Sequence, residues 1–60
     1  MKPEEILQLR KTTGLSIRAF ADKIGVNKAT VVHWEQGRHA PKGLALKALE
    51  RMAKRVAKRS

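Results

Sequence analysis

Apolar residues recur along this chain at spacings of three and four positions, which is the pattern of one buried face of an α-helix. The first such face contains Ile6 and Leu9 and predicts a helix over residues 3–13. Pro3 suits the first turn, where an N–H has no partner within the helix, and Gly14 can adopt the left-handed conformation that commonly ends a helix. No segment alternates apolar and polar residues as a half-buried strand would, so an all-α fold is expected.

Two short helices are predicted next, over residues 17–24 and 28–36. Ser16 and Asn27 carry side-chain oxygens that can cap the two N-termini, and a glycine follows each helix. Only three residues separate the two helices, so they must meet through a tight turn. The apolar face of the first of them consists of Ile17, Phe20, Ala21 and Ile24.

A fourth helix is predicted over residues 43–58, after a loop at residues 38–42 that contains Pro41. A long apolar stripe along this helix is its predicted core face. The stripe consists of Leu46, Leu49, Ala53 and Val56, widened by Leu44, Ala45, Ala48 and Met52. Because the chain has neither a linker nor a repeat, residues 1–60 are expected to form one domain.

The second and third helices and the turn between them have the composition of a helix-turn-helix unit, over about residues 16–36. Two helices that cross steeply need a small residue where they touch, here Ala21, and a turn residue that tolerates positive φ, here Gly25. Val31 then fills the crossing from the third helix. The outer face of that helix is polar apart from one short side chain, which suits the major groove of DNA. It consists of Asn27, Lys28, Ala29, Thr30 and His33.

The charge of the chain favours a polyanionic partner. Its 14 Lys or Arg residues against 5 Asp or Glu give a net charge of +9 and an isoelectric point near 11.1. The excess is concentrated in residues 38–60, where Glu50 is the single acidic residue. Long-range attraction to DNA is one interpretation of this basic end, and a solvated helix face is the plainer one.

The composition argues against several classes of small protein. The chain has no cysteine, which disfavours disulfide frameworks, CxxC redox sites and the usual zinc fingers. Glu4 and Glu5 stand where a signal peptide would be apolar, and no apolar run approaches a transmembrane length, so a cytoplasmic protein is expected. A core of this size supplies roughly 3–5 kcal/mol, which favours added stability from a partner.

An ordered set of short motifs runs through about residues 4–52. In chain order these are Leu9-Arg10, Gly14-Leu15-Ser16, Phe20-Ala21, Gly25-Val26, the run at residues 30–38, and Pro41. Together they resemble the helix-turn-helix domains of phage repressors and Cro-like regulators, the XRE type, which include the DNA-binding domains of several bacterial antitoxins. The resemblance implies a lambda-repressor-like bundle of four or at most five helices, in a protein of bacterial or phage origin.

Further residues relate the chain to one subgroup of this family and imply roles for single positions. Trp34, Gly37-Arg38 and Pro41-Lys42-Gly43 are similar to the pattern of the HigA and MqsA antitoxin subgroup. The resemblance also implies that Arg10 and Glu35 form a partly buried ion pair between the first helix and the end of the third, a structural role. The family usually carries a DNA-contacting Gln at the start of the second helix. This chain has Ile17 there, and Arg18 is the candidate to replace part of that contact.

The helix-turn-helix geometry predicts two sets of DNA contacts, to base edges and to phosphates. The base contacts are predicted for Asn27, Lys28, Ala29 and His33. The phosphate contacts are predicted for Ser16, Arg18, Thr30, Gln36, Gly37, Arg38, Lys42 and Gly43. Plainer explanations stay open for several of them. Lys28 and Arg38 can be solubilising, His33 a solvated residue, and Ala29 a choice of helix propensity.

Other chemistry is less favoured by the sequence. Trp34 is predicted to pack in the core, with stacking on a base as the alternative. His33, Glu35 and His39 come nearest to a metal site, but the chain has no cysteine or third histidine, and Glu35 is assigned to Arg10. No nucleophile with a base and no phosphate-cradling loop stands out, so neither enzymatic activity nor a cofactor is expected.

The sequence therefore predicts a regulator of transcription that binds a specific double-stranded DNA, as a repressor of its own operon and as a homodimer on an inverted repeat. The contact between two copies is predicted at Met52 and Val56. The alternative is an antitoxin that mainly binds a toxin, for which a 60-residue chain filled by one domain leaves no obvious extension. A membrane-active basic peptide is a third option, which the acidic first turn and the complete helix-turn-helix spacing disfavour, so no membrane partner is expected.

Overall fold

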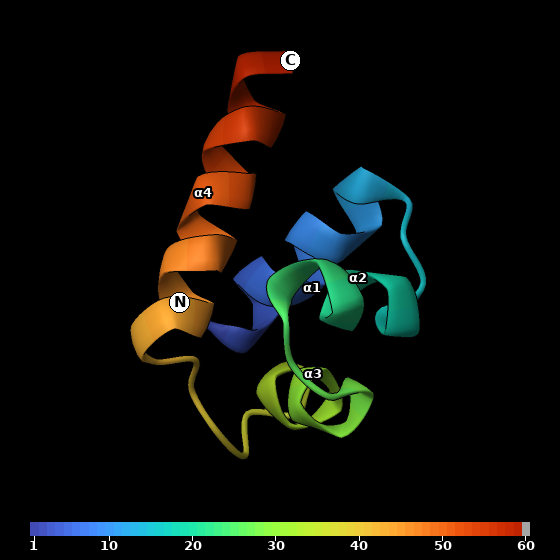
Figure 1. Ribbon diagram of the computed structural model, residues 1–60, viewed down its shortest axis with the longest axis vertical. Coiled ribbons are helices and arrows are strands. Elements are labelled where there is room, and N and C mark those ends of the chain that lie inside the picture. Colours follow the sequence, from blue (N-terminus) through green and yellow to red (C-terminus); the bar gives the residue numbers. More distant parts are fainter. Residues whose placement is uncertain (60) are drawn as a thin grey trace.

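The computed structural model describes residues 1–59, with side chains described for residues 1–57. The chain forms the helices α1 (Pro3–Thr13), α2 (Ile17–Ile24), α3 (Lys28–Glu35) and α4 (Gly43–Arg59) (Figure 1). No strand occurs in residues 1–59, so the all-α prediction is confirmed. The described elements number four, and the fifth helix that the resemblance allows is not among them.

The helices begin and end close to the predicted residues, because the sequence carries local signals for its helix ends. Gly14 and Gly25 adopt φ values of 73° and 91°, a left-handed conformation that a side chain would oppose. α3 ends at Glu35, one residue before the predicted end, and Gln36 is its C-cap. α4 begins at Gly43, as predicted.

The two predicted N-cap residues behave differently. Ser16 Oγ accepts a hydrogen bond from the Ala19 N–H at 3.2 Å, as expected of a capping serine. Asn27 occupies the N-cap position of α3, but its side chain makes no capping hydrogen bond, so that part of the prediction is wrong. The carboxamide of Asn27 is exposed instead, at the end of α3 where the sequence predicts base contacts.

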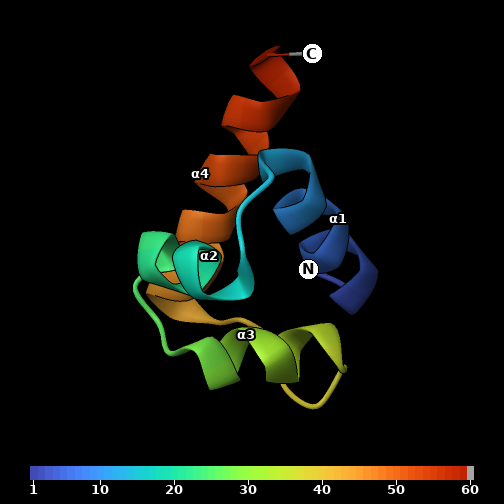
Figure 2. The same cartoon turned by 90° about the vertical axis from the view of Figure 1, so that its right-hand side faces the viewer.

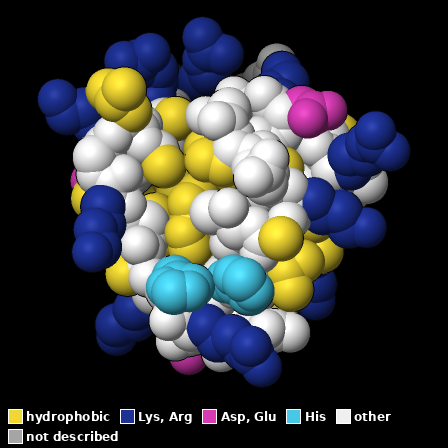
Figure 3. Space-filling model, turned by 60° about the horizontal axis from the view of Figure 1, so that its bottom comes forward, with side chains coloured by type: hydrophobic (Ala, Val, Ile, Leu, Met, Phe, Trp, Pro, Cys, Tyr) yellow, Lys and Arg dark blue, Asp and Glu magenta, His cyan; other side chains and the backbone are white. Residues whose placement is uncertain are grey.

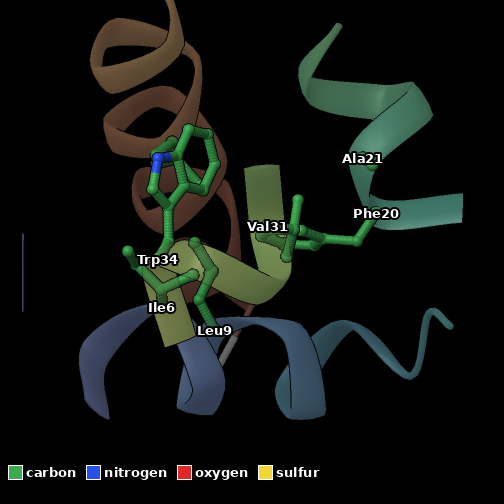
Figure 4. Packing of buried hydrophobic residues seen from close by; sticks show 7 residues of the cluster. Ile6, Leu9, Phe20, Ala21, Val31 and Trp34 are labelled. Atoms are coloured by element: carbon green, nitrogen blue, oxygen red, sulfur yellow. The ribbon is translucent and has the colours of Figure 1, made fainter. Parts of the chain in front are cut away.

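The core lies between α1, α2, α3 and the middle of α4. Figure 4 shows that Ile6 and Leu9 of α1 point toward Trp34 of α3. Phe20 of α2 points toward Val31 of α3 in the same view. Trp34 is 3% exposed, which confirms core packing rather than base stacking. The buried apolar residues that form the core cluster are Ile6, Leu9, Phe20, Ala21, Val31, Trp34 and Leu49.

Leu44 does not belong to the core stripe predicted for α4. Its side chain is 84% exposed, so that part of the prediction is wrong. Leu44 and the fully buried Leu49 stand five positions apart, which separates them by about 140° around a helix. When Leu49 faces the core, Leu44 therefore faces solvent.

The packing places α3 at one end of the molecule and the last turns of α4 at the other, as Figures 1 and 2 show. α1 and α2 both pack against α3 and α4. The chain that leaves α3 returns to the start of α4 at the α3 end (Figure 1). Within residues 1–59, no helix has the length and apolar character needed to cross a lipid bilayer.

Candidate nucleic-acid interface

α3 has one face in the core and one toward solvent. Val31 is fully buried and Trp34 nearly so, which fixes the helix against its neighbours. Lys28 and Ala29 are exposed and His33 is half-buried. At 100° per residue these three positions lie within about 140° of one another around the helix. The structure thus brings the predicted base-contact residues of α3 to one side, beside the exposed Asn27 at its N-cap.

Val32 also lies on this side of α3, although it was not among the predicted contact residues. By helical spacing it falls between Lys28 and Ala29, and its side chain is half-buried although it points away from Val31 and Trp34. An apolar side chain in this position suits the methyl group of thymine. Its spacing of four positions from Lys28 could have placed Val32 on this side of α3 from the sequence alone.

An ion pair ties the end of α3 to α1. Arg10 Nε donates to Glu35 Oε2 at 2.8 Å, and Arg10 Nη2 donates to Glu35 Oε1 at 3.2 Å. The two side chains are 19% and 12% exposed, so solvent screens the pair only in part. Two parallel bonds fix the orientation as well as the distance. The pair that the resemblance implies is confirmed, and it holds α3 in place rather than contacting a ligand.

Arg10, the basic member of the ion pair, stays charged at neutral pH. The side-chain hydrogen bond to Glu35 raises the pKa of the Arg10 guanidinium above its ordinary value, against the opposing effect of burial and with the help of the Glu35 charge. A basic group whose pKa is raised by folding stabilises the fold at every pH below its unfolded pKa. This contribution is therefore complete at neutral pH and is lost as the pH rises into strongly alkaline solution.

Two backbone N–H groups that follow α3 donate hydrogen bonds to carbonyl groups in its last turn. The Gly37 N–H donates to the Trp34 C=O at 3.1 Å, and the Arg38 N–H donates to the His33 C=O at 2.9 Å. With φ of 78° at Gly37, this is the Schellman ending of a helix. Gly37 therefore serves to end α3, and its N–H is not an open donor for the phosphate contact predicted there. The side chain of Arg38 is exposed just beyond the turn.

Two histidines lie side by side at the end of α3. The ring centroids of His33 and His39 are 5.3 Å apart, and the ring planes are tilted by 55°. Figure 3 shows the pair on the face seen from the α3 end, with Lys or Arg side chains beside it and acidic side chains at the margins. The turn after α3 thus adds His39 to this face. The sequence pattern had indicated His39 only as a candidate metal ligand.

The trio considered for a metal site is not assembled. Glu35 is held by Arg10, and the described residues contain no group of three or more His, Cys, Asp or Glu placed to hold a metal ion. The histidine pair therefore belongs to the polar surface formed by α3 and the turn after it.

The remaining predicted phosphate contacts come from the start of α2, from the first turn of α3, from the turn after α3 and from the start of α4. Ser16, Arg18, Gln36, Arg38, Lys42 and Gly43 are exposed, whereas Thr30 is half-buried. The first turn of a helix has backbone N–H groups without partners inside the helix, which at the start of α4 suits an anion. The contacts of all these residues stay predictions.

A comparison with known families agrees with this geometry. A family model described as helix-turn-helix matches residues 6–55. The chain belongs to this helix-turn-helix family. The matched segment contains α2, α3 and the Arg10–Glu35 pair, so the resemblance to XRE-type domains is confirmed.

Two curated proteins are similar to this chain. The HTH-type transcriptional regulator YiaG of Escherichia coli (strain K12) is 49% identical over 45 residues, which are 75% of this chain and 47% of YiaG. Antitoxin HigA-2 of Vibrio cholerae is 34% identical over 50 residues, which are 83% of this chain and 48% of HigA-2. The chain spans about half the length of the curated relatives it matches. No solved structure gives a significant match.

Proposed function

We propose that the chain acts as a sequence-specific regulator of transcription, without enzymatic activity, by placing α3 in the major groove of double-stranded DNA in a bacterial cytoplasm. The observation that carries the proposal is the exposed polar face of α3, on a helix whose opposite face is held in the core. Base recognition needs side chains held in a fixed geometry, and rigid elements provide it. Similarity to YiaG, which is named a transcriptional regulator, supports the regulatory role.

The roles of the individual residues follow from their positions. Asn27, Lys28 and His33 are proposed to hydrogen-bond base edges, while Ala29 and Val32 contact thymine methyl groups. Arg38 and Lys42, which are exposed on the chain between α3 and α4, are proposed to contact phosphates on one side of the groove. Ser16 and Arg18 at the start of α2 are proposed to contact phosphates on the other.

The proposal is tested by binding of the full chain to the DNA directly upstream of its own gene, with a shuffled fragment of equal length as control. Fluorescence anisotropy is measured over a series of salt concentrations. We expect log affinity for both fragments to fall linearly with log salt, and the upstream fragment to bind at least roughly 10³-fold more tightly. Equal affinity for the two fragments would contradict sequence-specific recognition.

We further propose that the protein represses its own operon as two copies on an inverted repeat. Two α3 helices about 34–36 Å apart would enter successive major grooves on one face of the DNA. Footprinting should then protect two half-sites, and deletion of the gene should raise expression from its own promoter. Protection of a single half-site would contradict the paired arrangement, and a fall in expression would indicate an activator.

The similarity to Antitoxin HigA-2 favours a second candidate, an antitoxin that binds a toxin as its main role. This candidate predicts that a protein encoded next to this gene arrests growth and copurifies with the chain. It also predicts protection from that arrest by the double variant Lys28→Ala, Arg38→Ala, which is expected to lose DNA binding. Loss of protection in this variant would favour the first candidate.

A further inference from the structure

A groove lies away from α3, between the ends of α1 and α2 and the middle of α4. Its volume is about 620 Å³, and it is partly open to solvent. Leu15, Ile24 and Met52 line it, and each is half-buried, so each presents apolar surface to the groove. The fold therefore leaves an apolar depression on a surface that the proposed contact with DNA does not use.

The charged side chains that line this groove all have the same sign. They are Lys23 at the end of α2 and Arg51 and Arg55 on α4, and all three are exposed. The combination is an apolar floor with a basic rim. A bound segment gains most when it presents apolar side chains to the floor and carboxylates to the rim.

The position of the groove separates it from the DNA-reading face. Figures 1 and 2 place α3 at one end of the molecule, while the later turns of α4 rise beyond α1 and α2 at the other end. The groove is lined by residues of α1, α2, α4 and the turn between α1 and α2, and none of them belongs to α3. An occupant of the groove can therefore bind while α3 is engaged with DNA.

We propose that this groove binds an amphipathic helix of a partner protein, with apolar residues along one face and Asp or Glu residues on both flanks. A helix laid into a groove places side chains at spacings of three and four onto the floor, and the flanks then meet Lys23 on one side and Arg51 and Arg55 on the other. The proposal is separate from DNA binding, because none of these residues belongs to the predicted DNA contacts.

Charge favours this occupant over a second copy of the chain. A symmetric contact through the groove would bring each basic rim against its equivalent, on two chains that each carry a net charge of +9. The contact between copies predicted at Met52 and Val56 uses this same surface. It stays a prediction and is the competing occupant in the experiment.

The probe is a synthetic helical peptide of about 15 residues, long enough to be partly helical, with leucines at spacings of three and four and Glu on both flanks. A second peptide has Lys in place of every Glu, and a third has Ser in place of every Leu. Affinity is measured by fluorescence anisotropy and the site by amide chemical shifts. We expect saturable binding of the first peptide that shifts the amides of Leu15, Ile24 and Met52, and at least about tenfold weaker binding of the other two.

A pair of double variants separates the groove from general attraction to a basic protein. Lys23→Glu with Arg55→Glu alters the rim, whereas Lys47→Glu with Lys54→Glu changes the net charge equally on exposed residues of α4 outside the groove. We expect the rim variant to lose about tenfold in affinity for the acidic peptide and to gain affinity for the Lys peptide. The control variant should change either affinity by less than about threefold.

Several results would overturn the proposal. Equal losses in the two double variants would show general attraction between opposite charges. Shifts confined to α3, or no saturable binding of the acidic peptide, would exclude the groove. Groove amides that shift with the concentration of the free chain, together with a dimer in sedimentation equilibrium, would assign the groove to a second copy. These measurements contain no DNA, so their failure and the failure of the proposed function are distinguishable.

Discussion

α3 and α4 both carry basic residues, but the fold holds the two helices in different ways. α3 has 8 residues, and it is fixed by the buried Val31 and Trp34 and by the bidentate contact between Glu35 and Arg10. α4 has 17 residues, and Leu49 is its fully buried residue within the described side chains. Met52 and Val56, farther along α4, are half-buried and line the groove.

The difference shows that the number of cations on a helix does not identify a reading surface. α4 carries more Lys and Arg than α3, yet among its described side chains Leu49 is the one that is fully buried. A short helix that buried side chains and an ion pair hold on its inner side can keep its outer side chains in register with base edges, whereas a long helix with a half-buried stripe offers a general positive field and a docking surface.

The largest expected difference in unfolding free energy is between a substitution of the buried aromatic of α3 and one of an exposed leucine of α4. Trp34→Ala removes a side chain that is 3% exposed, and the cavity should cost about 3–5 kcal/mol of unfolding free energy, which equals most of the stability of so short a chain. Leu44→Ala, at 84% exposure, should change it by less than about 0.5 kcal/mol. Thermal unfolding by circular dichroism measures both, and a cooperative transition near the wild-type temperature in Trp34→Ala would contradict the packing described for α3.

Within the proposed interface, residues of α3 should affect specificity and those beyond it should not. Lys28→Ala and His33→Ala should each cost about 1–3 kcal/mol of binding free energy on the specific DNA and much less on shuffled DNA. Arg38→Ala should weaken both by similar factors, because phosphates carry no sequence information. Affinity for a panel of single-base operator variants is the measurement. Uniform losses in all three variants would remove the distinction between the two classes of contact.

The Arg10–Glu35 pair should affect the stability of α3 before it affects recognition. Arg10→Ala or Glu35→Ala leaves one partly buried charge without its partner, and each should lower the free energy of unfolding by about 1–2 kcal/mol. The double variant should be less damaging than the sum of the two, because the pair is broken only once. Denaturant titration of the four proteins gives this coupling, and additive losses would argue against a direct interaction. The raised pKa of Arg10 predicts that the coupling persists from neutral pH well into the alkaline range.

The smallest expected difference in unfolding free energy is between substitutions of the two N-cap residues, Ser16 and Asn27. Ser16→Ala removes a capping hydrogen bond and should cost about 1 kcal/mol of unfolding free energy. Asn27→Ala removes no such bond and should cost clearly less, but it should weaken binding of specific DNA. Urea titration and anisotropy separate the two effects. A stability loss in Asn27→Ala as large as that in Ser16→Ala would show that Asn27 caps α3 in solution.

Most of the fold could be predicted from the sequence because its signals are local. Glycines at 14 and 25 end two helices by positive φ, a preference that belongs to the residue itself. The apolar spacing of three and four assigned Ile6, Phe20 and Val31 to the core without knowledge of their partners. Side-chain capping was less predictable, since Ser16 and Asn27 look alike in the sequence and only the first one caps.

The candidate site was predicted in part for the same reason. The face formed by Lys28, Ala29 and His33 follows from helical periodicity alone, and the Arg10–Glu35 pair came from resemblance to a family, not from spacing. The occupied N–H of Gly37 and the tilted contact between the His33 and His39 rings depend on how the chain turns after α3. Because tertiary contacts determine the conformation of that turn, no periodic pattern in the sequence predicts it.

The sequence by itself thus determined the helices, their inward faces and the polar side of α3, because helix propensity, capping and amphipathic spacing act over a few residues. Only the tertiary structure decided which surfaces meet. It exposed Leu44, joined Glu35 to Arg10 across 25 positions, and brought Lys23 and Arg55 to one apolar groove. The physical reason is that these contacts depend on the angles at which whole helices pack, and those angles are fixed by the combined fit of the core rather than by any one segment.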